Sequence, residues 1–99
     1  MCIGDYYRRV LEVVEALTGV TKEQIEGKCR VRDLVDARCM VIQLMRTAGY
    51  YPRQISQTLG VSVRWVQKVH SEFDYRVRSS VDPMLRINWE QAAKILRSN

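Results

Sequence analysis

The sequence of 99 residues has little of what several large classes of protein require. It contains five glycines and two prolines, which argues against a disordered or collagen-like chain. No apolar run approaches the roughly 18 to 20 residues of a membrane-spanning helix, so we expect no membrane partner. The N-terminal stretch MCIGDYYRRV has an early acidic residue and no long apolar segment. We therefore expect no secretory signal and a cytoplasmic protein.

Metal ligands and catalytic patterns are also scarce. The three cysteines, Cys2, Cys29 and Cys39, form no Cys-x-x-Cys pair, and His70 is the one histidine. Because a structural zinc site usually needs four closely spaced Cys or His ligands, we expect reduced thiols and no metal. The sequence has no G-x-x-x-x-G-K-[ST] phosphate loop and no evident nucleophile–base pair. We expect no cofactor, no small-molecule substrate and no enzymatic activity.

The chain does have an excess of positive charge, and the excess lies in its middle. The net charge is +5, and residues 28–78 hold ten of the 16 basic residues but four of the 11 acidic ones. Eight of those ten are arginines, whose planar guanidinium suits phosphates and base edges. The excess is either a solvated face or a surface for a polyanion such as nucleic acid.

Apolar residues recur at helical spacing along the chain, and no segment alternates long enough to predict a strand. The pattern predicts helices over residues 5–18, 33–48, 52–59, about 62–77 and 89–97, with a short helix between Thr21 and Gly27. A basic loop precedes residue 33, and a connection covers residues 79–87. We predict an all-α fold, a small helical bundle of about five or six helices. It forms a single domain over residues 1–99, with its core in about residues 8–78.

Several residues predict where these helices begin and which face they bury. Thr21 with Gln24, Ser62, and Asn88 with Gln91 have the types and spacing of N-terminal caps. In the long helix one apolar stripe consists of Leu34, Ala37, Val41, Leu44, Met45 and Ala48.

The stretch ISQTLGVSVRWVQKVHSEF, residues 55–73, has the pattern of a helix-turn-helix. Gly60 suits a tight turn between steeply crossed helices because glycine accepts a positive φ. Ser56 is small enough for the second helix to cross closely over the first. The residues expected to face inward are Ile55, Leu59, Val61, Val66 and Val69.

With that face inward, the second helix presents a polar and basic outer face. It consists of Ser62, Val63, Arg64, Gln67, Lys68 and Ser71, and no acidic residue follows until Glu72. Arginine pairs with guanine and glutamine with adenine in the major groove of DNA. Together with the basic loop, this pattern favours a sequence-specific double-stranded DNA-binding protein. A packed helical hairpin without DNA binding is the plainer alternative.

Most of the aromatic residues can be explained by packing alone. We expect Trp65 to be a partly buried packing residue and His70 to lie at the surface or near a phosphate. The tyrosines at positions 6, 7, 50 and 51 are either half-buried rim residues or a stacking platform for single strands.

From Val13 to about Val77 the chain resembles the C-terminal DNA-binding domain, domain IV, of the bacterial replication initiator DnaA. Four stretches carry the resemblance: VVEALTGVTKEQIEGK, KCRVRDLVDAR, CMVIQLMRTAGYYPRQISQTLG and the second helix of the helix-turn-helix. It implies a double-stranded DNA-binding protein of the bacterial cytoplasm or nucleoid. The recognition helix would lie in the major groove, and the basic loop in the minor groove.

The resemblance also implies roles for individual residues. Arg30 enters the minor groove, supported by Lys28 and Arg32, and Arg38 holds a phosphate. An inserted arginine is attracted by the enhanced negative potential of a narrow minor groove. The complete predicted DNA-binding set is Lys28, Arg30, Arg32, Arg38, Arg53, Ser62, Val63, Arg64, Gln67, Lys68 and Ser71.

The chain departs from that family at the start of the recognition helix. It has VSVRWV where the family carries an Asp-His-Thr-Thr signature, so the resemblance extends to fold and docking mode but not to target sequence. Without a phosphate loop we expect a free-standing initiator-type domain, in replication control, transcription control or a mobile element.

Two other functions stay open on the sequence. A protein-interaction module would show an exposed apolar patch made by Tyr50, Tyr51, Trp65 and Trp89. An RNA or single-strand binder would depend on the tyrosines. Monomer and dimer are equally compatible with the sequence.

Overall fold

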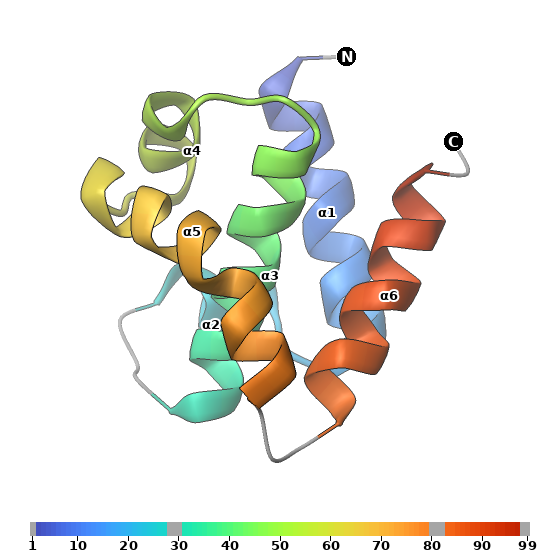
Figure 1. Cartoon of the computed structure of the whole chain (residues 1–99). Helices are drawn as coiled ribbons and strands as arrows, with labels where there is room; N and C mark the ends of the chain where they lie inside the picture. Colours follow the sequence, from blue (N-terminus) through green and yellow to red (C-terminus); the bar gives the residue numbers. More distant parts are fainter. Residues whose placement is uncertain (1, 28–30, 80–82, 98–99) are drawn as a thin grey trace.

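The computed structural model describes residues 2–27, 31–79 and 83–97, and these form six α-helices (Figure 1). The helices are α1 (Ile3–Thr18), α2 (Lys22–Glu26), α3 (Arg32–Thr47), α4 (Pro52–Leu59), α5 (Val63–Ser79) and α6 (Met84–Arg97). The described residues contain no strand. The prediction of an all-α bundle is therefore confirmed. No helix in these ranges has both the length and the apolar content that a membrane crossing requires.

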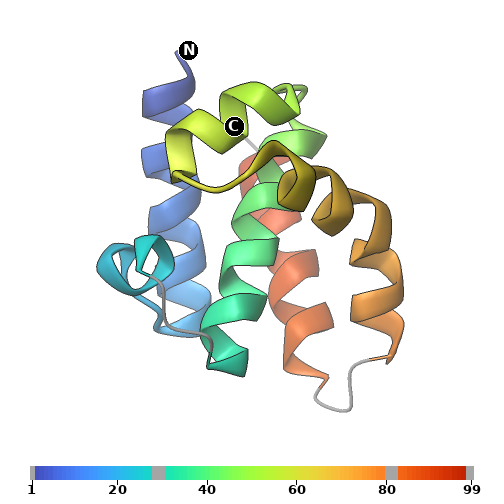
Figure 2. The ribbon, with the colours of Figure 1, turned by 90° about the vertical axis from the view of Figure 1, so that its left-hand side faces the viewer.

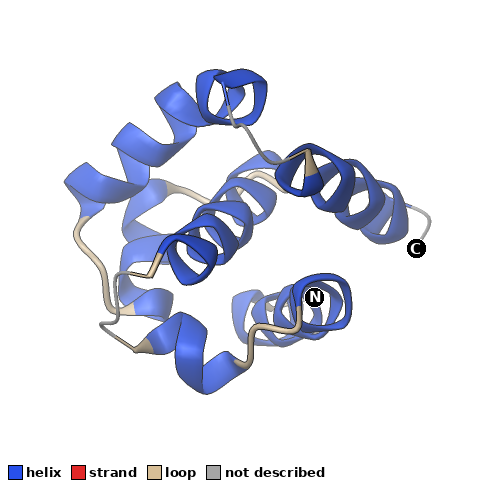
Figure 3. Ribbon diagram, turned by 90° about the horizontal axis from the view of Figure 1, so that it is seen from below, coloured by secondary structure: helices blue, strands red, loops and turns tan. Residues whose placement is uncertain are grey.

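Helix α3 is the centre of the fold. It contacts each of the other five helices, which lie around it in the view from below (Figure 3). Six consecutive residues, Ala37–Ile42, are buried, together with Leu44 and Met45. The sequence predicted one apolar stripe here, but neighbours on several sides bury most of the circumference, and Ala48 from that stripe is exposed.

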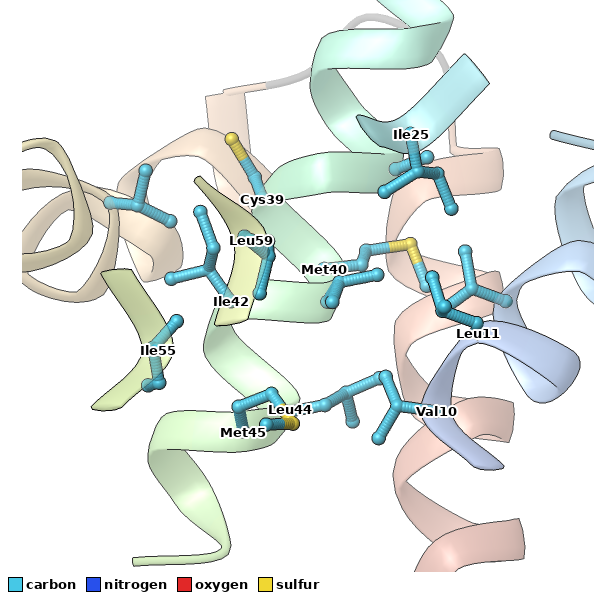
Figure 4. Close-up of a cluster of buried hydrophobic side chains, with 14 of the residues drawn as sticks. Val10, Leu11, Ile25, Cys39, Met40, Ile42, Leu44, Met45, Ile55 and Leu59 are labelled. Atoms are coloured by element: carbon cyan, nitrogen blue, oxygen red, sulfur yellow. The ribbon is translucent and has the colours of Figure 1, made fainter. Parts of the chain in front are cut away.

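The core is one continuous cluster of apolar side chains on both sides of α3. Figure 4 shows Ile42 beside Leu59 of α4, whereas Met40 extends toward Leu11 of α1. Because α3 is shared by both halves of this cluster, the position of α4 and α5 depends on the same packing as that of α1 and α6.

The first two helices end as the sequence predicts. Gly19 follows α1 with φ at 77° and donates its N–H to Glu15 O. Thr21 and Gln24 form the predicted capping box at the start of α2.

Tyr7 was expected at a half-buried rim, but it is buried and donates its hydroxyl to Glu26 Oε2 at 2.9 Å. Burial, reinforced by this hydrogen bond, raises the pKa of the Tyr7 phenol.

Helix α6 begins earlier than predicted. It starts at Met84 rather than residue 89, so Asn88 lies inside the helix and is not its cap. The cause is Leu85, which is buried together with Ala92 and extends the apolar face by one turn toward the N-terminus. The ring of Trp89 packs edge-on against Phe73 of α5, with centroids 4.7 Å apart. The last helix therefore packs on the bundle, against α1, α3 and α5.

Cys39 gives a chemical test of the buried centre. Burial raises the pKa of its thiol to about 11, whereas Cys2 is exposed. Since the thiolate is the reactive form, a variant with serine at positions 2 and 29 should react with a disulfide reagent at pH 8 only through unfolding. We expect the rate to be about 100-fold or more below that of the unfolded chain.

The raised pKa of Cys39 also determines how the stability of the protein changes with pH. The folded thiol holds its proton more tightly than an unfolded thiol with a pKa of 9.0, so its contribution to stability is complete below that pH. The free energy of unfolding should fall between pH 9 and pH 11. Rapid modification of Cys39 in the folded protein at pH 8 would contradict this burial.

Candidate nucleic-acid interface

The turn between α4 and α5 is a compact three-residue connection. Gly60 ends α4 with φ at 74° and donates its N–H to Ser56 O at 2.9 Å. Val61 N–H donates to the same carbonyl, and the Ser56 hydroxyl donates to Val61 O. These bonds fix the path of the chain where α5 turns away from α4, as seen in Figure 2.

The inward face of this helix pair is the one predicted. Ile55, Leu59, Val66 and Val69 are buried, and Val61 is partly buried against the same core. Phe73 is also fully buried one turn further along α5. Trp65 is partly buried and packs on the core, which confirms its structural reading.

The outward face of α5 is also the one predicted. Ser62 caps the helix, because its hydroxyl accepts the N–H of Trp65 at 3.1 Å. Each member of the predicted outer face is exposed to solvent: Ser62, Val63, Arg64, Gln67, Lys68 and Ser71. Since positions three and four apart share a helix face, Arg64, Lys68 and Ser71 form one ridge along α5.

Charge is segregated on this part of the molecule. Residues 37–71 contain no Asp or Glu, and they include most of α3, all of α4 and the first half of α5. Neither Arg64 nor Lys68 forms an ion pair with any residue that the structure describes. Both charges are therefore available to an external anion.

Two further predicted residues are exposed at other edges of the helices. Arg53 lies in the first turn of α4, directly after Pro52, and Arg32 is the first residue of α3. Lys28 and Arg30, the predicted minor-groove residues, lie outside the described residues.

Arg38 does not fit its predicted role. Its side chain is 7 % exposed, and Nε donates to Ile25 O at 2.7 Å while Nη2 donates to Gln24 O at 3.1 Å. The guanidinium thus binds the carbonyls at the end of α2 rather than a phosphate. The sequence pattern placed Arg38 off the apolar stripe, and it is the packing of α2 against α3 that covers it.

Two contacts that no sequence pattern predicted join α5 to α3. Arg76 forms an ion pair with Asp36 at 2.7 Å, and His70 Nδ1 lies 2.9 Å from Gln43 Oε1. All four residues are polar and distant in sequence, so no local pattern connects them. They fix the direction in which the outer face of α5 points.

The exposed aromatic patch expected of a protein-interaction module is not found among its predicted members. Tyr50 and Trp65 are half-buried, Trp89 packs on Phe73, and only Tyr51 is largely exposed. Tyr6 pairs with Tyr50, their ring centroids 5.6 Å apart, so these two rings pack on each other at the predicted rim.

No metal-binding group was found in the described ranges, where no three Cys, His, Asp or Glu side chains gather. The hollows on these residues are shallow and lined by mixed polar and apolar groups.

Comparison with known families gives one match. The profile of a family described as a homeodomain-like domain matches residues 32–85, more than half of the chain. The match runs from the first residue of α3 into the start of α6 and contains the whole helix-turn-helix. Searches of curated proteins and of solved structures return no match. This family supports a DNA-binding helix-turn-helix and is not specific to the replication initiator.

The turn can be tested at Gly60. Replacing it with alanine forces an L side chain into a positive φ, and we expect a loss of about 1–2 kcal/mol in the free energy of unfolding. Gly4→Ala is the matched control, because Gly4 lies in α1 with open space around it. Denaturant unfolding should show that this control leaves stability equal or slightly higher. If Gly60→Ala and Gly4→Ala had the same free energy of unfolding, the positive φ at Gly60 would not disfavour alanine, which would contradict this prediction.

The structural role of Arg38 can be separated from phosphate binding. Arg38→Met keeps an aliphatic stem but removes the donors to Gln24 O and Ile25 O, and should cost about 1–3 kcal/mol of stability. Arg53→Met is the control, since Arg53 is exposed and its loss should leave unfolding within about 0.5 kcal/mol. Unchanged stability of Arg38→Met, with a shallower salt dependence of duplex binding, would restore the phosphate role.

Proposed function

The chain belongs to the homeodomain-like helix-turn-helix family, and from this premise we propose that it is a sequence-specific double-stranded DNA-binding protein. Helix α5 enters the major groove with its N-terminal residues toward the base edges. Arg64 and Gln67 are the residues proposed to read bases, and Lys68 is proposed to contact the backbone.

One observation carries this proposal: the outer face of α5 is exposed, basic and free of internal ion pairs among the described residues. A solvated surface of ordinary composition mixes both signs of charge. Here Arg64 and Lys68 lie exposed on the second helix of a helix-turn-helix, in a stretch of the chain without acidic residues. Polyanion binding explains this segregation, and a structural hairpin does not require it.

The remaining predicted residues take supporting positions in the proposal. Arg53, in the first turn of α4, is proposed to contact a phosphate, because the first helix of the motif crosses the DNA backbone. Arg30 is proposed to enter the adjacent minor groove, with Lys28 and Arg32 in support, as the resemblance to DnaA domain IV implies.

The process is also a proposal. We assign the protein to replication or transcription control in a bacterial cytoplasm or nucleoid, with no enzymatic activity of its own. The support is the resemblance of the sequence to an initiator domain together with the DNA-binding character of the family.

Binding is tested by fluorescence anisotropy with a labelled random-sequence duplex and the matching single strand. We expect the duplex to bind more tightly, with log Kd rising linearly with log salt concentration. Preference for the single strand would overturn the proposed mode, and no duplex binding at low salt would overturn the function.

Arg64 is the sharpest single-residue test of base reading. Selection of binding sites from a random duplex library, with wild type and Arg64→Ala, should show relaxed preference at one base position and a loss of about 1–3 kcal/mol on the wild-type site. Arg86→Ala on α6 is the control, since Arg86 is an exposed arginine outside the helix-turn-helix. Equal weakening of all sequences by Arg64→Ala would assign this side chain to the phosphate backbone.

A further inference from the structure

The outer ridge of α5 continues beyond the residues that the sequence analysis selected. Tyr75 follows Ser71 by four positions and therefore lies on the same face as Arg64, Lys68 and Ser71. Its side chain is 69 % exposed. Its backbone carbonyl accepts from the Ser79 hydroxyl, whereas its phenol hydroxyl has no hydrogen-bond partner among the residues that the structure describes.

Tyr75 lies far along α5 from the residues proposed to read bases. At about 1.5 Å per residue, it is about 16 Å along the helix from Arg64. In the proposed docking mode the N-terminal residues of the recognition helix contact the base edges, so Tyr75 lies beyond the base-reading residues.

Charges of both signs surround Tyr75. Glu72 and Asp74, both exposed, flank the ridge on α5, and they repel a phosphate that approaches closely. Tyr75 also lines a shallow hollow of about 300 Å³ together with Glu72, Arg32 and the Asp36–Arg76 ion pair. Arg32, the exposed first residue of α3, supplies a cation at the same place.

We propose that the Tyr75 hydroxyl donates a hydrogen bond to a DNA phosphate beyond the base-reading segment, with Arg32 as the neighbouring cation. Tyrosine is among the side chains that commonly contact DNA phosphates. This inference rests on the proposed function, and it extends the contact surface of α5 by one helical turn.

The test is Tyr75→Phe, which removes only the hydroxyl from an exposed ring. Binding to a labelled random-sequence duplex is measured by anisotropy at several salt concentrations. We expect about three- to tenfold weaker binding, corresponding to one hydrogen bond, with the slope against log salt unchanged because the group is neutral. The weakening should be the same on a duplex selected from a random library.

Two further variants sharpen the result. Tyr6→Phe makes the same chemical change on α1 and should leave binding unchanged. Arg32→Gln removes one charge and should reduce the salt slope by about 0.9. Thermal unfolding of Tyr75→Phe should match the wild type, so that weaker binding is not a consequence of misfolding.

The outcomes separate this inference from the proposed function. If the wild type binds duplex and Tyr75→Phe binds equally well, the phosphate contact is wrong and the proposed function stands. If Tyr75→Phe alters the ratio between selected and random duplexes, Tyr75 reads a base and the phosphate assignment is overturned. If the wild type binds no duplex, both fall.

Discussion

The packing of α5 against α3 is the constraint on which the rest of the molecule depends. Val66 and Phe73 of α5 are fully buried, and each such side chain contributes about 1.5–3 kcal/mol through removal from water. The Asp36–Arg76 and Gln43–His70 contacts lie at the edges of this interface and contribute less, because exposed polar pairs are worth about 0–1 kcal/mol. Apolar burial therefore holds the helix, and the polar pairs select its rotation.

The arginines serve two different purposes. Arg38 lies under α2 and satisfies two carbonyls at the end of that helix, where an unpaired guanidinium would be costly to bury. Arg64 lies on the face of α5 that points away from the core, and it has no partner among the described residues. The same side-chain chemistry thus serves the fold at one position and is available for DNA at the other.

The distribution of acidic residues gives the outer face of α5 a direction. The first half of α5 lies within a stretch that has no Asp or Glu. The second half of α5 carries Glu72 and Asp74 as well as Arg76 and Arg78. The attraction for a polyanion is therefore strongest at the N-terminal end of α5, the end that base readers of this class use.

The sequence by itself determined where most of the helices begin and end. It also determined which face of the helix-turn-helix points inward and that the outer face is exposed. Those features depend on local signals: apolar spacing, Gly60 at a positive φ, and the caps at Thr21 and Ser62. It misplaced the start of α6 because the burial of Leu85 depends on neighbours distant in sequence. Only the tertiary structure decided that Arg38 is buried. Burial is set by which helices pack together, and a single helical pattern records only which of its own residues share a face.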